Sequence, residues 1–80
     1  MKVTIYSVPD CPHTKALREF LKEKGVDFEM KCVLDDPRIL EEMYKISGQR
    51  GVPVTVIDND VFVGYDRMIE RRMTRRLGGK

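Results

Sequence analysis

Hydrophobic residues recur along this chain with two different periods. Four segments alternate apolar or β-branched residues with polar ones, which predicts strands, and they span residues 2–7, 26–33, 53–57 and 61–63. In the remaining periodic segments, apolar residues lie three or four positions apart, which predicts helices. These segments span residues 12–24, residues 37–47, and a last stretch that follows Asp66 and ends at Gly78-Gly79.

Local signals set the ends of the predicted helices. Pro12 suits the first position of a helix, because its ring fixes a helical φ and its missing N–H would be unpaired there. Gly25 ends the first helix. Asp36 before Pro37, and Asp66 before the last helix, are typical N-cap residues. The chain is therefore read as strand, helix, strand, helix, strand, strand, helix.

This order predicts one α/β domain over residues 1–80, with a four-stranded mixed sheet and three helices. The first two strands are joined by a helix, so they are expected to be parallel, with a right-handed crossover. The last two strands are separated by Asp58-Asn59-Asp60 and form a hairpin. Ligands of such sheets gather at the carboxyl ends of the parallel strands, and Cys11 lies there.

Composition and charge exclude several classes of protein. The chain is 41% hydrophobic and 35% charged, which is typical of a globular protein. A net charge of +2 is too small to indicate nucleic-acid binding. No apolar run approaches the ~20 residues that cross a membrane, and no signal-peptide pattern is visible. Two cysteines do not make a disulfide scaffold, so we expect a cytoplasmic protein in a reducing environment.

The segment Cys11-Pro12-His13-Thr14 is the strongest candidate for chemistry. A cysteine at the start of a helix faces unpaired N–H groups and the positive end of the helix dipole, and both favour the thiolate. Such sites lower a cysteine pKa from about 8.5 to roughly 3.5–7.5. Thr14 stands where a second cysteine would complete C-x-x-C, and its hydroxyl can donate to the sulfur. One-thiol chemistry is therefore predicted; a capping cysteine without reactivity is the alternative.

Two further segments are candidates for binding. Pro53 enters a strand, where proline removes a ladder donor, and a cis Val52-Pro53 bond would expose the Val52 backbone to an extended ligand. A trans proline at a sheet edge is the alternative. Gly64 allows close approach of a ligand, and Asp66 can bind an ammonium group. The simpler interpretation is a turn glycine followed by a capping aspartate.

Together these segments resemble the glutaredoxin family of thioredoxin-fold proteins. The resemblance covers nearly the whole chain and is carried by Val3-Thr4-Ile5-Tyr6, Cys11-Pro12, Gly51-Val52-Pro53 and Val63-Gly64-Tyr65-Asp66. It implies a thioredoxin-like fold and a catalytic site of Cys11, Pro12 and Thr14. It also implies a substrate-binding surface that comprises His13, Arg50, Val52, Pro53, Gly64, Tyr65 and Asp66.

The resemblance assigns individual roles within that surface. Pro53 would be the cis-proline, and Val52 would pair with the cysteinyl part of glutathione. Gly64 and Asp66 would hold its γ-glutamyl end. The family usually carries lysine three residues before the cysteine, whereas this chain has Val8. Two segments look closer to a bacterial glutaredoxin-like subgroup: Gln49-Arg50-Gly51-Val52-Pro53 and Val63-Gly64-Tyr65-Asp66. Some members of this subgroup carry selenocysteine at the position of Cys11. Others resemble redoxins that are reduced by thioredoxin reductase.

Other residues invite functional interpretations that we weigh against simpler ones. Cys32 suggests a second reacting thiol, but we expect it to be buried and inert in its strand. His13 can act as a base, yet an exposed neutral histidine is the simpler expectation. The last helix is basic and is interpreted as a solvated face; its arginines are Arg67, Arg71, Arg72, Arg75 and Arg76. The side chains expected to fill buried or half-buried positions include Met43, Met68 and Met73.

The sequence therefore predicts a monomeric thiol–disulfide oxidoreductase of monothiol type. Its thiolate at Cys11 would reduce glutathione mixed disulfides, with glutathione as co-substrate and no bound cofactor or metal. Its partners would be proteins or small molecules that carry disulfides, and the electron donor would be glutathione or a thioredoxin reductase. Two alternatives remain open: a dimer that carries an iron–sulfur cluster through Cys11, and a thioredoxin-fold interaction module without activity.

Overall fold

The computed structural model describes residues 1–78 of the chain. Its helices and strands follow the predicted order: β1 (Val3–Ser7), α1 (Pro12–Glu23), β2 (Glu29–Cys32), α2 (Pro37–Ser47), β3 (Val54–Ile57), β4 (Asp60–Val63) and α3 (Arg67–Arg76). The predicted end of the last helix at Gly79 lies outside the described residues, and α3 closes at Leu77.

The strands form one four-stranded sheet in the order β2-β1-β3-β4. β1 pairs with β2 in parallel, and it pairs with β3 antiparallel, while β3 and β4 form the hairpin. The predicted mixed sheet is confirmed. The loop that carries Cys11 leaves β1 at one end of the sheet, and β3 begins at the same end because the two strands run in opposite directions.

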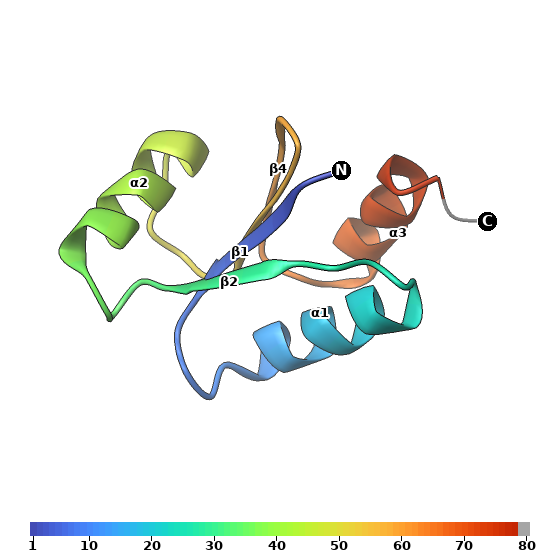
Figure 1. Cartoon of the computed structure of the whole chain (residues 1–80), viewed down its shortest axis with the longest axis horizontal. Helices are drawn as coiled ribbons and strands as arrows, with labels where there is room; N and C mark the ends of the chain where they lie inside the picture. Colours follow the sequence, from blue (N-terminus) through green and yellow to red (C-terminus); the bar gives the residue numbers. More distant parts are fainter. Residues whose placement is uncertain (79–80) are drawn as a thin grey trace.

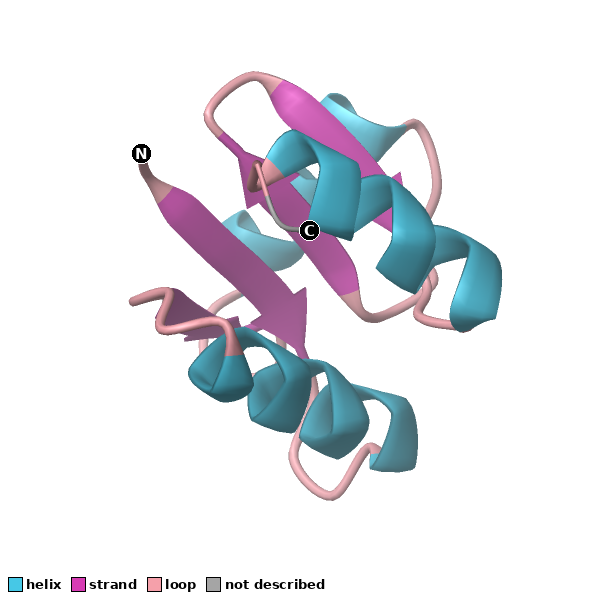
Figure 2. Cartoon of the chain, turned by 90° about the vertical axis from the view of Figure 1, so that its right-hand side faces the viewer, coloured by secondary structure: helices cyan, strands magenta, loops and turns pink. Residues whose placement is uncertain are grey.

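Two layers of helix cover the sheet. Helices α1 and α3 lie over one face and α2 lies over the other, as Figures 1 and 2 show. Under α1 and α3 the core contains Ile5, Leu17, Leu21 and Met73, all fully buried. A smaller cluster under α2 is built around Met43. Burying one such side chain stabilises a fold by about 1.5–3 kcal/mol, so the packing fixes α1 and its first residue on the sheet.

Side-chain caps start α2 and α3 as predicted. The Asp36 carboxylate accepts a hydrogen bond of 2.9 Å from the backbone N–H of Arg38, and the Asp66 carboxylate accepts one of 2.9 Å from the N–H of Ile69. Each bond satisfies an N–H group that has no partner within its helix. These caps fix where the loops end, including the loop that precedes α3.

Two expectations about β2 and α3 were wrong. The strand predicted over residues 26–33 is confined to Glu29–Cys32. The N–H of Val26 instead closes the end of α1 by donating to the carbonyl of Leu21 at 3.0 Å, which removes it from the ladder. Met68 is 68% exposed rather than buried, because α3 turns Met73 toward the core.

Candidate functional site around Cys11

Cys11 is the N-cap residue of α1. Its backbone is extended, with φ −79° and ψ 117°, and Pro12 begins the helix directly after it. Asp10, just before the cysteine, has a positive φ of 61°, a conformation that aspartate tolerates better than most residues. The turn places the half-buried thiol beside the first helical N–H groups, as the sequence predicts.

These groups lower the pKa of the Cys11 thiol below its ordinary value. The Thr14 side chain has the largest effect, through a hydrogen bond to the sulfur, and burial opposes it. The backbone N–H groups of Thr14 and His13 and the hydroxyl of Ser7 add to the lowering. All of these groups act on the charged form, so the site favours a thiolate, which is the form that attacks disulfides.

Ser7 is a member of the site that the sequence reasoning missed. It is the last residue of β1, only 1% exposed, and its Oγ forms a hydrogen bond with Oγ1 of Thr14, which is itself buried. When Ser7 donates in this bond, the Thr14 proton is free to point at the sulfur. The sequence did contain a signal: Ser7 is two residues after Ile5, so the two side chains lie on the same inward face of β1.

We expect Thr14→Val to move the reactivity of Cys11 to higher pH. Removal of the Thr14 hydroxyl takes away the largest influence that lowers the pKa of Cys11, so less thiolate is present at neutral pH. The pH dependence of alkylation by iodoacetamide measures this shift. The Thr14→Ser variant keeps a hydroxyl and should stay close to the natural profile. If both variants matched the natural chain, Thr14 would not act on the sulfur.

Val52 and Pro53 lie at the end of the sheet from which the Cys11 loop departs. Their peptide bond is cis, as the resemblance implies. In the antiparallel register, Tyr6 is opposite Val54, so continuing the pairing brings Val8 opposite Val52. Both valines pack on the cluster under α2. Val8, where the family usually has lysine, therefore contributes to packing.

Gly64 links this segment to the start of α3. Its N–H donates a hydrogen bond of 2.7 Å to the carbonyl of Pro53, and its φ is +79°, a region that favours glycine. A side chain at Gly64 would meet no atom within 4 Å, so the surface is open at this point. Asp66 follows, exposed, with one carboxylate oxygen used in capping α3.

Three other candidate residues have contacts of their own. The ring of Tyr65 lies 5.9 Å from that of Phe20, and its hydroxyl donates to Glu70, so these contacts join α3 to the core. Arg50 stacks on Tyr44 of α2, with its guanidinium carbon 4.9 Å from the ring centre. His13 is exposed, and its backbone N–H faces the sulfur.

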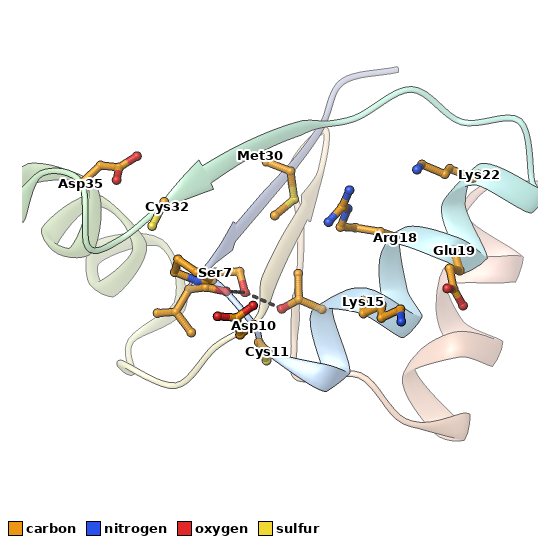
Figure 3. Close-up of a pocket in the computed structure, with 13 residues that line it drawn as sticks. Ser7, Asp10, Cys11, Lys15, Arg18, Glu19, Lys22, Met30, Cys32 and Asp35 are labelled. Atoms are coloured by element: carbon orange, nitrogen blue, oxygen red, sulfur yellow. Dashed lines mark hydrogen bonds between the residues drawn. The ribbon is translucent and has the colours of Figure 1, made fainter.

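The expectation that Cys32 is buried was wrong, because Cys32 is only half-buried. It lies at the end of the edge strand β2 and shares a pocket of about 540 Å³ with Cys11, Ser7 and Thr14. Figure 3 shows the two sulfur atoms on different walls of this pocket. Both thiols are free.

The described part of the chain contains neither a candidate metal site nor a helix that could span a membrane. Within residues 1–78, no three His, Cys, Asp or Glu side chains are grouped closely enough to hold a metal ion. None of the helices in the same range is both long and apolar enough to cross a membrane. On the basic last helix, Arg76 is paired with Asp58 at 2.8 Å and also with Asp60.

Comparisons with known proteins find glutaredoxins among the relatives of this chain. The sequence profile of the glutaredoxin family matches residues 3–63. A glutaredoxin-like 8.6 kDa protein encoded in the rubredoxin operon of Clostridium pasteurianum is 43% identical over 74 residues, which cover 86% of this chain and 99% of that protein. A probable glutaredoxin of Synechocystis is 33% identical over 66 residues, covering 81% of this chain and 75% of that protein.

Solved structures show the same fold. The glutaredoxin of Archaeoglobus fulgidus superimposes with a TM-score of 0.84 at 32% identity, over 98% of this chain and 87% of that one. The glutaredoxin-like NrdH-redoxin of Escherichia coli, described as having a thioredoxin-like activity profile, gives a TM-score of 0.74 at 32% identity, over 89% of this chain and 93% of that one. The thioredoxin-like fold is thereby confirmed, and this chain belongs to the glutaredoxin family.

Proposed function

We propose that the protein exchanges thiols and disulfides through Cys11 alone, and that glutathione mixed disulfides are its substrates. The observation that carries this proposal is the lowered pKa of Cys11 at the start of α1, with threonine at the position of a second cysteine. Exchange is fastest when the attacking thiol has a pKa near the ambient pH, so a moderate lowering is sufficient.

The proposed reaction has two balanced steps. The Cys11 thiolate attacks the glutathione sulfur of a mixed disulfide, a new S–S bond forms, and the substrate leaves as a thiolate that takes up a proton from water. A second glutathione thiolate then attacks the glutathione sulfur bound to Cys11. Glutathione disulfide leaves, and the Cys11 thiolate is restored. The substrate is released as a free thiol, one free glutathione is consumed, and the disulfide bond ends in glutathione disulfide.

Groups on the side of Cys11 toward β3 and α3 would hold the bound glutathione. Among residues 1–78, no side chain or loop backbone hydrogen-bonds to the N–H or carbonyl of Val52, so both are free to pair with the cysteinyl part. The open surface at Gly64 leaves room for the γ-glutamyl end, and Asp66 would bind its ammonium group. Both cysteines are unpaired, which suits a reducing compartment such as the cytoplasm.

Two observations favour an alternative electron donor. The protein is similar to an NrdH-redoxin described as having a thioredoxin-like activity profile, and Val8 replaces the family's usual lysine near the thiol. A thioredoxin reductase is therefore the alternative donor, with its own thiolate taking the place of the second glutathione.

The test is a turnover assay on the mixed disulfide of glutathione and mercaptoethanol. NADPH oxidation is followed with glutathione plus glutathione reductase in one arm and with thioredoxin reductase in the other. We expect turnover in the glutathione arm. Turnover in the thioredoxin reductase arm alone would contradict the role of glutathione, and no turnover in either arm would contradict the proposed function.

We expect Asp66→Asn to raise the KM for the glutathione mixed disulfide by about 1.4-fold to fivefold, because an exposed ion pair contributes about 0.2–1 kcal/mol. Asparagine caps a helix as well as aspartate does, so the stability of α3 should not change. The matched control is Asp36→Asn, which removes the same charge from the N-cap of α2. Equal effects of both variants would mean that Asp66 does not meet glutathione.

A further inference from the structure

The pocket that contains Cys11 extends away from the glutathione-binding side of the proposed site. It lies between α1 and β2 and has a volume of about 540 Å³, enough for several residues of a peptide. Neither Val52 nor Gly64 nor Asp66 borders it. A mixed disulfide held at Cys11 therefore has space on this second side that glutathione does not need.

The wall formed by β2 is suited to an extended chain. β2 is an edge strand, so its outer side has no neighbouring strand. Parallel pairing places Met30 beside Ile5, on the face of the sheet that α1 covers. Met30 nevertheless remains 41% exposed and borders the pocket, so an apolar surface faces the opening. Methionine adapts readily to different partners at such surfaces.

The wall formed by α1 carries a row of cations. Lys15, Arg18 and Lys22 are spaced by three and four residues, which places them on one side of the helix, and all three border the pocket. None of the three forms an ion pair within residues 1–78. Their positive charge is therefore available to a ligand.

The carboxylates of the same pocket lie elsewhere. Figure 3 shows Arg18 turned toward Met30, with Lys22 farther along the same side of α1, whereas Glu19 points away from β2. Asp10 lies beside Cys11, and Asp35 lies past the far end of β2. The end of the pocket near Arg18 and Lys22 is thus positive, and the end near Asp35 is negative.

We infer that this pocket binds an acidic segment of a protein substrate, next to the cysteine whose disulfide is exchanged. Arg18 and Lys22 lie seven and eleven residues beyond Cys11, or about 10 and 16 Å along a helix that rises ~1.5 Å per residue. An extended peptide covers about 3.3 Å per residue, so its carboxylates would lie about three to five residues from the reacting cysteine. This inference rests on the proposed function, and it names the class of protein substrate.

The test uses glutathione mixed disulfides of short peptides with blocked ends. The peptides are identical except for glutamate or glutamine at the third to fifth positions before the cysteine, or at the same positions after it. We expect kcat/KM to be about threefold to tenfold higher for the glutamate peptide of one of the two series at low salt, because two exposed charge pairs form. The difference should disappear near 1 M salt, where the screening length is about 3 Å.

Two double variants locate the effect. In Arg18→Gln/Lys22→Gln the ratio between glutamate and glutamine peptides should fall to about one. The control, Arg71→Gln/Arg75→Gln, removes the same charge from exposed positions on α3 and should keep the preference. The inference is overturned if the natural protein shows no preference, or if both variants lose it equally. Turnover of the mercaptoethanol mixed disulfide shows separately whether the proposed function holds.

Discussion

Cys11→Ser is expected to reduce the turnover of glutathione mixed disulfides to the uncatalysed background. A serine hydroxyl does not ionise near neutral pH, so the groups that favour the thiolate at the start of α1 have no anion to stabilise. Every step of the proposed exchange forms or breaks a bond to this one sulfur. The NADPH-coupled assay measures the loss, and mass spectrometry should show that the variant no longer gains a glutathionyl group at residue 11.

The matched control is Cys32→Ser, which removes the other thiol of the same pocket. We expect this variant to retain most of its activity, and to form the glutathionyl adduct at Cys11 to the same extent as the natural chain. If Cys32→Ser were as inactive as Cys11→Ser, the one-thiol mechanism would be wrong. That outcome would indicate a mechanism in which Cys32, from the same pocket, releases the glutathione bound to Cys11.

The element order and the sheet topology could be predicted because local and periodic signals agree. Asp36 followed by Pro37 begins α2, and both predicted caps form the expected hydrogen bonds. The strand β2 shows where such reasoning fails. Val26 and Phe28 continue the apolar alternation, but they pack on the core from the connection after α1, and the N–H of Val26 completes the end of that helix.

The candidate site was predictable only in part. A cysteine that precedes proline at a strand-to-helix turn is placed at the start of the helix by its sequence neighbours alone. The position and the lowered pKa of Cys11 therefore followed from local rules. The hydrogen bond between Ser7 and Thr14 joins two separate elements and depends on how α1 packs against β1. The exposure of Cys32 depends on β2 being an edge strand, a property of the whole sheet that no local pattern contains.

Leu17→Ala is expected to lower the free energy of unfolding by about 2–5 kcal/mol, the usual cost of deleting a fully buried leucine side chain. Leu17 is 0% exposed in the core that holds α1 on the sheet. Because domains of this kind are stable by only about 5–15 kcal/mol, the loss should be plain in urea denaturation.

Leu34→Ala makes the same chemical change at a side chain that is 72% exposed, and it should alter stability by no more than about 0.5 kcal/mol. The difference between the two variants isolates the contribution of packing. Similar small losses in both would contradict the placement of α1. In the folded fraction of Leu17→Ala, α1 still lies on the sheet and the pKa of Cys11 should remain lowered, because its causes are the Thr14 and Ser7 hydroxyls and nearby N–H groups in the first helical turn. The packing of α1 would then determine how much of the protein is folded, and the groups around the Cys11 sulfur would determine how reactive the folded protein is.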